Sequence, residues 1–300
     1  MSTVIIIVGP TAVGKTSLSI ELAKHFNTQI VSADSRQCYR ELNIGVAKPS
    51  DEELKEVHHY FINSHSIHED VNAGVYEQYA LQSVDEIFKH NKIAVMVGGT
   101  GLYVKAFCEG MDVMPAIPDE VRRQIITQYN TNGLVWLQEQ VQIKDPGFWA
   151  TAEQQNPQRL MRALEMVEAT GISITTFRQK KKIERPFNII KIGLELPKPL
   201  LYHNINTRVD IMMEQGLLKE AEALIPVREL NALQTVGYRE LFDYFDDKCT
   251  LEKAVEQIKI NTRHYAKRQM TWFKRDEDIK WFDAKESSVE EILKGLGLKV

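Results

Sequence analysis

The stretch VIIIVGPTAVGKTSLSIELAKHF, residues 4–26, decides the fold. It opens with the β-branched run Val4–Val8, which predicts a buried strand. The spacing G-x-x-x-x-G-K-[ST] follows, carried by Gly9, Gly14, Lys15 and Thr16. Apolar residues then recur as on one face of a helix, at Leu18, Leu22 and Phe26. A strand, a glycine loop and a helix in this order are the context that a phosphate-binding P-loop requires.

The residue types of this loop explain how it would hold an anion. Glycines allow the backbone to come close to a ligand, and the backbone N–H groups and the positive end of the helix then face it. Lys15 adds a mobile positive charge, and the Thr16 hydroxyl is a typical Mg²⁺ ligand. Two linked phosphates are therefore expected, but the pattern leaves open whether ATP or another diphosphate ester carries them.

Composition limits the class of protein. The chain has 300 residues, of which 43% are hydrophobic and 26% charged, as in ordinary soluble globular proteins. We find no apolar run long enough for a membrane helix and no signal peptide. The cysteines Cys38, Cys108 and Cys249 are far apart, which fits neither a disulfide framework nor a zinc site. We therefore expect a cytoplasmic protein without membrane contact, and the lack of heptads favours a monomer.

The charge is unevenly distributed. The formal net charge is −4, yet residues 259–275 carry six Lys/Arg and no acid, and residues 178–186 form a second basic cluster. Tyr265, Trp272 and Phe273 lie among the cations of the first stretch. Aromatic and cationic side chains together suit single-stranded nucleic acid. The alternative is a solvated helix face whose aromatic residues pack inward.

The order of patterns predicts the domain organisation. Continuous apolar segments at 29–34, 92–97 and 187–196, with a further strand at 58–64, alternate with helices, which indicates a buried parallel sheet. Between about 115 and 183 the pattern is helical only. We predict an α/β fold in which a P-loop NTPase-like parallel sheet, residues 1–114 and 184–300 with a helical C-terminal part, receives a helical insertion domain at 115–183.

Two further segments belong to the same edge of the sheet. Asp34 ends the second strand beside the P-loop, where open α/β sheets bind ligands. It is a candidate Mg²⁺ ligand or general base, or else a helix N-cap in ADSRQ. The turn GGTGLY, residues 98–103, brings the Thr100 hydroxyl to that edge, although it is equally typical of a tight packing turn.

These residues carry a resemblance to a known family. The chain resembles the tRNA dimethylallyltransferases, also called tRNA isopentenyltransferases, of the bacterial type without a C-terminal zinc finger. The matching segments, in the order of that family, are GPTAVGKT, VSADSRQCYRELNIGVAKP, VGGTGLYVKA, NPQRLMRALEMVEATG, NTRVDIMMEQGLLKEAEAL, TVGYRE and HYAKRQMTWFKR. The chain departs from the family pattern in two places. Val46 stands where Thr is expected, and HHYFINS stands where an HHLID-like run is expected. Position 63 is therefore Asn and does not carry the acid of that run.

The resemblance implies a reaction and its parts. The enzyme would transfer the dimethylallyl group of dimethylallyl diphosphate to N6 of the adenine immediately 3′ of the anticodon, with Mg²⁺. Asp34 would be the base and Thr100 the second catalytic residue. The diphosphate would be held by Gly9, Thr11, Ala12, Val13, Gly14, Lys15, Thr16 and Arg208. Thr16 would also hold the Mg²⁺.

The resemblance implies that the tRNA anticodon stem-loop lies on the helical insertion and the basic C-terminal stretch. The target adenine would then leave its stack to reach a crevice between the two domains. The expected tRNA contacts are Ser35, Arg36, Gln37, Arg122, Gln158, Arg159, Leu160, Met161, Arg162, Arg263, Lys267 and Arg268. Should the C-terminal stretch not contact the tRNA, the segment Lys180–Lys182 is the next candidate.

Three other functions are open to the sequence. A P-loop kinase of small molecules explains the first 110 residues but not the basic aromatic C-terminus. An isopentenyltransferase of free adenine nucleotides does not need the insertion or the two basic clusters. A non-catalytic RNA-binding protein does not need an intact Lys15, Thr16 and Asp34.

Overall fold

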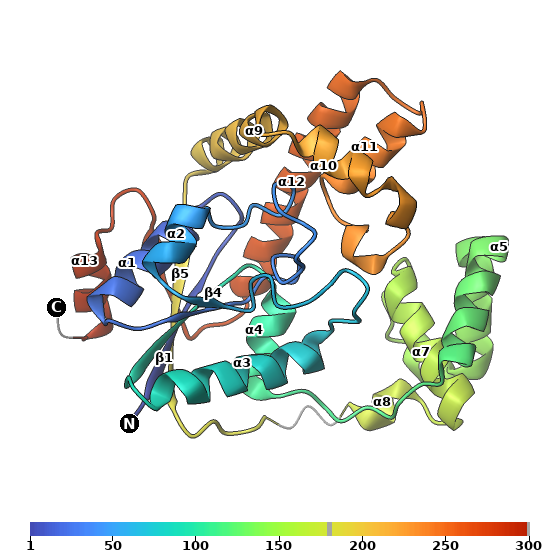
Figure 1. Ribbon diagram of the computed structural model, residues 1–300. Coiled ribbons are helices and arrows are strands. Elements are labelled where there is room, and N and C mark those ends of the chain that lie inside the picture. The colour runs from blue at the N-terminus through green and yellow to red at the C-terminus, as the bar shows by residue number, and fades with distance from the viewer. Residues whose placement is uncertain (179–181, 299–300) are drawn as a thin grey trace. The chain divides into compact units, whose positions relative to one another are not determined.

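The computed structural model describes residues 1–178 and 182–298 and contains a six-stranded sheet (Figure 1). Its order is β3-β2-β4-β1-β5-β6, and the pairs between these strands are parallel. The strands are β1 (Thr3–Val8), β2 (Ile30–Ser32), β3 (His59–Tyr60), β4 (Ile93–Val97), β5 (Asn188–Glu195) and β6 (Ile279–Asp283). The predicted parallel α/β sheet is confirmed.

The central strand β1 shows why the P-loop stretch decides the fold. All residues from Val4 to Val8 are fully buried. Val4, Ile6 and Val8 enter the apolar cluster on one face of the sheet, whereas Ile5 and Ile7 enter the cluster on the other. A strand buried on both faces reads as a continuous apolar run, as this one does.

Helices cover both faces of the sheet in the part of the chain that carries it. Side chains of α3 (Ala73–Phe88) and α4 (Gly101–Glu109) belong to the apolar cluster that contains Ile6, whereas those of α1 (Lys15–His25) and α13 (Val289–Leu296) belong to the cluster that contains Ile5. The other helices of this part are α2 (Asp51–Glu56), α9 (Lys198–Glu214), α10 (Leu217–Ala223), α11 (Tyr238–Phe245) and α12 (Leu251–Phe273), with short 3₁₀ turns at Ile225–Val227 and Asn231–Leu233. None of the described helices is both long enough and apolar enough to cross a bilayer.

The chain divides into two compact units, Met1–Glu109 with Glu184–Val300, and Gly110–Ile183. The second unit contains α5 (Asp119–Lys144), α6 (Pro146–Trp149), α7 (Pro157–Thr170) and α8 (Ile174–Phe177), and no strand among its described residues. Its own core includes Leu137, Leu160 and Leu164. The helix α7 starts at an Asn156 cap and ends at Gly171, whose φ of 70° suits glycine. The division after Glu109 coincides with the end of α4, a few residues before the predicted boundary.

Two strand predictions need correction. Within 58–64 only His59 and Tyr60 pair with β2, because Phe61 and Asn63 have φ of 64° and 55°, which turn the chain out of the sheet. The edge strand β6 was not predicted at all. Its Trp281 packs over Gly193 of β5, where an added Cβ would lie 2.6 Å from the indole ring.

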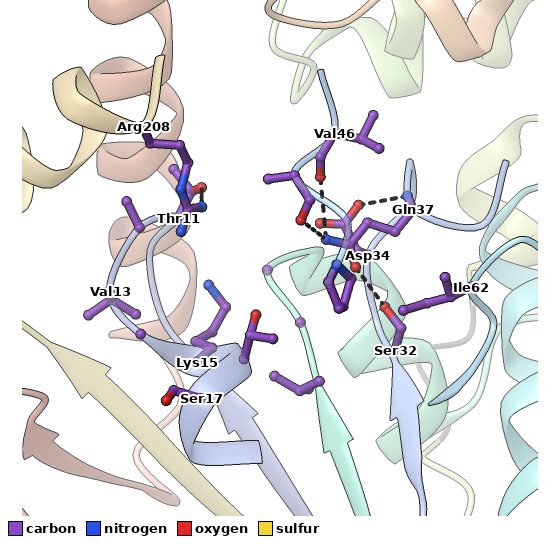
Figure 2. A pocket seen from close by; sticks show the side chains of 18 of the residues that line it. Thr11, Val13, Lys15, Ser17, Ser32, Asp34, Gln37, Val46, Ile62 and Arg208 are labelled. Atoms are coloured by element: carbon purple, nitrogen blue, oxygen red, sulfur yellow. Dashed lines mark hydrogen bonds between the residues drawn. The ribbon is translucent and has the colours of Figure 1, made fainter. Parts of the chain in front are cut away.

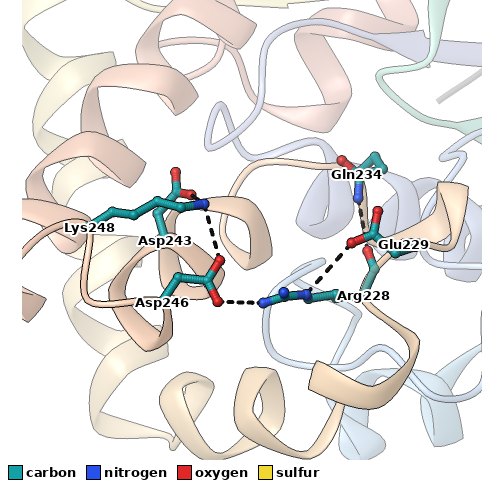
Figure 3. Close-up of polar contacts among 6 residues, drawn as sticks. All are labelled: Arg228, Glu229, Gln234, Asp243, Asp246 and Lys248. Atoms are coloured by element: carbon teal, nitrogen blue, oxygen red, sulfur yellow. Dashed lines mark hydrogen bonds and ion pairs between the residues drawn. The ribbon is translucent and has the colours of Figure 1, made fainter. Parts of the chain in front are cut away.

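A network of exposed charges joins the segments around α11 (Figure 3). Arg228 pairs with Asp246 at 2.6 Å, and Lys248 pairs with both Asp246 and Asp243. The amide of Gln234 donates to the carbonyl oxygen of Arg228. Surface pairs of this kind contribute little to stability, so the packing of Tyr238 and Leu241 in the core, rather than these charges, anchors α11.

Arg185 anchors the segment before β5 to α3 and α4. Its guanidinium donates to the carbonyl oxygens of Phe107 and Ala106, which end α4, and pairs with Glu77 of α3 at 2.6 Å. The two charged side chains are only 8% and 14% exposed. Arg185 therefore satisfies helix-end carbonyls that would otherwise be unpaired.

We expect Arg185→Met to lower the free energy of unfolding by about 3 kcal/mol, because it leaves Glu77 as an uncompensated, nearly buried charge. Urea unfolding followed by circular dichroism measures the change. The control is Lys89→Met, which breaks the exposed pair with Glu86 and should change stability by less than about 0.5 kcal/mol. Equal effects of the two substitutions would contradict this account of Arg185.

Candidate active site

A cavity of about 290 Å³ opens at the carboxyl ends of β1, β2 and β4. The P-loop, Thr11–Ser17, lines one side, and Asp34 and Gln37 line another (Figure 2). The glycines Gly98 and Gly99 after β4 and residues of α9 and α12 complete the wall. The strand order explains this meeting of segments, because β4 lies between β2 and β1 and the loops after neighbouring parallel strands share one edge.

The P-loop has the backbone geometry that its glycines predict. Gly9 has a φ of 146°, and a Cβ there would lie 2.5 Å from the carbonyl oxygen of Leu194. Gly14 has a φ of 103° and immediately precedes α1. The remaining predicted diphosphate residues, Thr11–Thr16 and Arg208, line the cavity, whereas Gly9 acts from behind it through close backbone packing. The N-terminal amides of α1 are thus directed to the cavity.

Two cations share this cavity. Lys15 is partly buried and donates to the carbonyl oxygen of Pro10 at 2.7 Å, while Arg208 donates to the Thr11 hydroxyl at 3.3 Å. Burial, reinforced by the charge of Arg208 and opposed by Asp34, lowers the pKa of Lys15 to about 7. Burial also lowers the pKa of Arg208. An anion between these groups would favour their charged forms, so the electrostatics favour an anionic ligand.

Asp34 combines two of the roles that its sequence context allows. Its Oδ1 accepts hydrogen bonds from the backbone N–H of Arg36 at 2.8 Å and of Gln37 at 3.3 Å, as in a capping turn. Within the described residues, Oδ2 accepts no such bond, and the side chain lines the cavity. The cap therefore fixes the orientation of the carboxylate and leaves one oxygen for a ligand.

The turn after β4 likewise serves both packing and the site. A Cβ on Gly98 would lie 2.2 Å from the carbonyl oxygen of Ala33, so the turn rests directly on the chain before Asp34. The Thr100 hydroxyl accepts from the backbone N–H of Ser35 at 3.0 Å, and the Thr100 N–H donates to Ala33. Thr100 is thereby held beside the Asp34 segment, together with the predicted residues Ser35, Arg36 and Gln37.

Gln269 of α12 connects the P-loop with this turn, a role that no sequence pattern indicates beyond the place of Gln269 in the motif HYAKRQMTWFKR. Its Oε1 accepts from the backbone N–H of Thr11 at 2.8 Å, and its Nε2 donates to the carbonyl oxygen of Gly99 at 2.9 Å. The side chain is 5% exposed, and a Cβ on Gly99 would lie 2.0 Å from Nε2. Gln269 therefore fixes the distance between the two glycine loops.

Tyr265, one of the aromatic residues of the basic C-terminal stretch, also lies on α12 and lines the cavity. Burial raises the pKa of its hydroxyl, and the nearby charge of Asp34 adds to the effect. The phenol therefore stays protonated and remains a hydrogen-bond donor toward the cavity.

The loop that carries Val46 forms another wall. The Gln37 amide donates to the carbonyl oxygens of Val46 and Ala47, and Glu220 accepts from the backbone N–H of Ile44 and Gly45. Val46 thus presents an apolar side chain where the family pattern has a hydroxyl. Asn63, the other departure, accepts from Lys48 at 2.5 Å and does not line the cavity.

The arginines of the helical unit that are predicted to contact RNA pair with acidic side chains of the same unit. Arg122 and Arg162 pair with Glu165, which is 5% exposed, and Arg159 pairs with Glu153. The side chain of Leu160 is fully buried in the core of the unit, so the prediction that it meets an RNA is corrected for the side chain. Gln158 is exposed and Met161 is partly buried.

The predicted cations of α12 differ in their surroundings. Arg263 donates to the Asn206 side chain at 2.8 Å and pairs with Glu256 at 3.2 Å. Lys267 and Arg268 are exposed. In the second basic cluster, Lys180 and Lys181 lie outside the described residues.

The donor set of the cavity suits a weakly held hard cation. No three His, Cys, Asp or Glu residues are grouped as a metal site in the described chain. The Thr16 hydroxyl lines the cavity beside the anion-binding loop. Mg²⁺ commonly takes one or two protein ligands and completes its shell with phosphate oxygens and water, which this arrangement fits.

Comparisons with known proteins agree with these features. A family model described as IPP transferase matches residues 37–276. A tRNA dimethylallyltransferase of Flavobacterium psychrophilum is 50% identical over 291 residues, 95% of each chain. One of Christiangramia forsetii is 49% identical over 282 residues, 94% of this chain and 93% of the relative. The solved full-length tRNA isopentenylpyrophosphate transferase of Bacillus halodurans has a TM-score of 0.73 and 35% identity, covering 99% of this chain and 96% of that one.

We expect Gln269→Leu to lower the free energy of unfolding by about 2 to 4 kcal/mol, because it leaves the Thr11 N–H and the Gly99 carbonyl without a partner in a buried setting. Urea unfolding measures this. Gln257→Leu is the matched control, since Gln257 lies on the same helix, is exposed and, in the part of the chain that the structure describes, has a side chain that bonds only to Asn261. A loss no larger than that of the control would show that the bridge does not stabilise the fold.

Proposed function

The chain belongs to the IPP transferase family, and we infer that it is an enzyme that transfers a dimethylallyl group to tRNA. Relatives at about half identity over nearly their whole length bear the name tRNA dimethylallyltransferase. The observation that carries the inference is the shared cavity, in which Lys15 and Arg208 meet Asp34. An anion-binding loop and a carboxylate in one cavity suit a reaction that releases both an anion and a proton, because the loop can hold the anion and the carboxylate can accept the proton.

The donor in our proposal is dimethylallyl diphosphate, and the acceptor is N6 of the adenine immediately 3′ of the anticodon. The N6–C1 bond forms while the C1–O bond to diphosphate breaks, and one proton leaves N6. The allylic C1 can carry positive charge, so departure of the diphosphate is the step that most needs electrostatic help.

The leaving group would be stabilised by the P-loop. Lys15 and Arg208 line the cavity, and together with the N-terminal amides of α1 they would face the position where its negative charge grows. Because burial depresses the pKa of Lys15 in the free protein, the arriving diphosphate would restore full charge to this side chain. Bound Mg²⁺, held by the Thr16 hydroxyl, would supply further charge neutralisation.

The proton of N6 would go to Asp34. An adenine amino group is a weak nucleophile because its lone pair is delocalised, so a positioned base is needed as the N–C bond forms. The capped Oδ1 holds the carboxylate in place, and Oδ2 is available to accept the proton. The Thr100 hydroxyl, held by Ser35, would orient the amino group.

The tRNA would contact residues next to the general base Asp34 and residues on two helical surfaces. Ser35, Arg36 and Gln37 flank Asp34. The contacts that we propose in the helical unit are Arg122, Gln158, Arg159, Met161 and Arg162, and those on α12 are Lys267 and Arg268. Arg263 is a weaker candidate because Asn206 and Glu256 already engage it.

An assay with a labelled dimethylallyl diphosphate tests the proposal. The enzyme is offered tRNA, AMP or ATP in turn, and digested products are analysed by mass. We expect label in N6-modified adenosine from tRNA only. Label in AMP or ATP would indicate a nucleotide isopentenyltransferase instead. No transfer, with phosphoryl transfer from ATP to a small molecule, would indicate a kinase.

We expect Lys15→Ala and Thr16→Ala to abolish transfer and leave tRNA binding nearly unchanged, because both residues face the diphosphate. Initial rates and gel-shift titrations with tRNA measure the two effects. Lys24→Ala is the control, since Lys24 lies on the same helix but pairs with Glu56 at the surface. An equal loss of tRNA affinity in the Lys15 and Thr16 variants would contradict this separation of roles.

Asp34→Asn should lower kcat by about 10²-fold or more, the usual contribution of a positioned base. Asparagine keeps the acceptor oxygen that caps Arg36 and Gln37, so the loop should survive. Single-turnover rates at saturating substrates measure the effect, with Asp243→Asn in the surface network as the control. A rate close to that of the unchanged enzyme would leave Asp34 as a capping residue only.

A further inference from the structure

A carboxylate that does not itself line the cavity holds one of its walls. Glu220 of α10 accepts hydrogen bonds from the backbone N–H of Ile44 at 2.8 Å, through Oε2, and of Gly45 at 2.9 Å, through Oε1. The Tyr238 hydroxyl of α11 donates to Oε1 at 2.6 Å. We call residues 44–49 the wall loop. Glu220 reaches the cavity through this loop, since three of the loop residues line the cavity: Val46, Ala47 and Pro49.

The backbone of the wall loop depends on such support. Ala47 has a φ of 49°, in the left-handed region that a residue with a side chain disfavours. Its N–H donates to the carbonyl oxygen of Ile44 at 3.0 Å, which closes a turn. On the outer side of this turn the buried Tyr238 ring packs over Gly45, where a Cβ would lie 2.6 Å from the ring. A disfavoured conformation persists where its surroundings determine it, so Glu220 and Tyr238 fix the loop.

The inner side of the wall loop is bonded to the segment of the general base. The side-chain amide of Gln37 donates to the carbonyl oxygens of Ala47 at 2.9 Å and Val46 at 3.3 Å. The backbone N–H of Gln37 also donates to Oδ1 of Asp34, at 3.3 Å. Figure 2 shows Gln37 beside Asp34, with its hydrogen bond to Val46. A displacement of the wall loop would therefore move Gln37 and turn the carboxylate that it caps.

We propose that Glu220 is a positioning residue for the general base. It fixes the wall loop, the wall loop fixes Gln37, and Gln37 orients the Asp34 carboxylate toward the N6 proton. This rests on the proposed function, because it requires Asp34 to accept that proton. The role needs a carboxylate, since three donors converge on Glu220, whereas an amide has one acceptor oxygen and would turn its own N–H₂ group toward a backbone N–H.

Glu220→Gln tests the proposal in single turnovers at saturating dimethylallyl diphosphate and tRNA. We expect the rate to fall about ten-fold or more, because a small misplacement of a reacting group causes a loss of this size. The affinity for inorganic diphosphate should stay within about two-fold, since the P-loop is unchanged. Glu222→Gln is the matched control, because Glu222 is exposed on the same helix. A rate for Glu220→Gln equal to that of the control would overturn the proposal.

A double-mutant cycle separates the positioning of Asp34 from a general loss of stability. In the Asp34→Asn background the base is already absent, so Glu220→Gln should lower the remaining rate by less than about two-fold, because substitutions that act through one group are not additive. A variant that merely loosened the fold would lower the rate by the same factor in both backgrounds. Equal factors would therefore also overturn the proposal.

Gly45→Ala displaces the wall loop without altering Glu220, and it decides the question even where Glu220→Gln does not fold. The added Cβ would meet the Tyr238 ring and push the loop away from it. We expect the rate to fall about ten-fold here too, and to fall much less in the Asp34→Asn background. An unchanged rate, or an equal loss in both backgrounds, would count against Glu220 acting through this loop.

The outcomes also separate this proposal from the proposed function. If the unchanged enzyme modifies tRNA and Asp34→Asn is slow, but Glu220→Gln and Gly45→Ala are not, the function stands and the positioning role fails. If the unchanged enzyme transfers nothing to tRNA, the proposed function fails and the positioning role fails with it.

Discussion

The two hydrogen bonds of the Gln269 amide are the contacts on which the geometry of the site depends. The sheet order brings the loops after β1, β4 and β2 to one edge, but loops at one edge are free to differ in separation. Gln269 accepts from Thr11 in the first loop and donates to Gly99 in the second. Thr100 then continues the connection to Ser35 in the third, beside Asp34. The anion-binding loop and the carboxylate are therefore held at a fixed distance through buried, well-directed bonds.

The charges of the cavity follow from the same arrangement. Burial depresses the pKa of Lys15, repulsion from the charge of Arg208 adds to the effect, and the charge of Asp34 opposes it. An anionic leaving group would relieve this repulsion and leave the carboxylate available for the proton of the incoming nucleophile. On our proposal, α12 contributes to both parts of the reaction, since Gln269 bridges the loops, and Lys267 and Arg268 contact the RNA.

Local patterns were sufficient for the parts of the fold that depend on neighbouring residues. The β-branched run and the glycine spacing predicted β1, the P-loop and α1. Strand β6 was not predicted because it depends on the packing of Trp281 over Gly193, a contact with a strand that is distant in the sequence. For the same reason, the sequence could not show that Lys259 and Lys274 have acidic partners, because Asp210 and Glu195 reach them from outside the basic stretch. The sequence shows Gln269 only as a position in a family motif. Its bridging role depends on α12, the P-loop and the turn after β4 lying together in the folded chain.

The most direct test of the central claim is the pH dependence of kcat in Gln269→Glu, expressed relative to the unchanged enzyme. A protonated glutamic acid can accept from Thr11 and donate to Gly99 as the amide does, whereas its carboxylate places a charge against the Gly99 carbonyl. Burial and this contact should raise the pKa of the new carboxyl. We predict a relative kcat that is about 10²-fold reduced near pH 9 and recovers as the pH falls toward about 6. A relative kcat that stays close to one throughout, or a loss that does not change with pH, would contradict the claim that this bridge sets the geometry of the reaction.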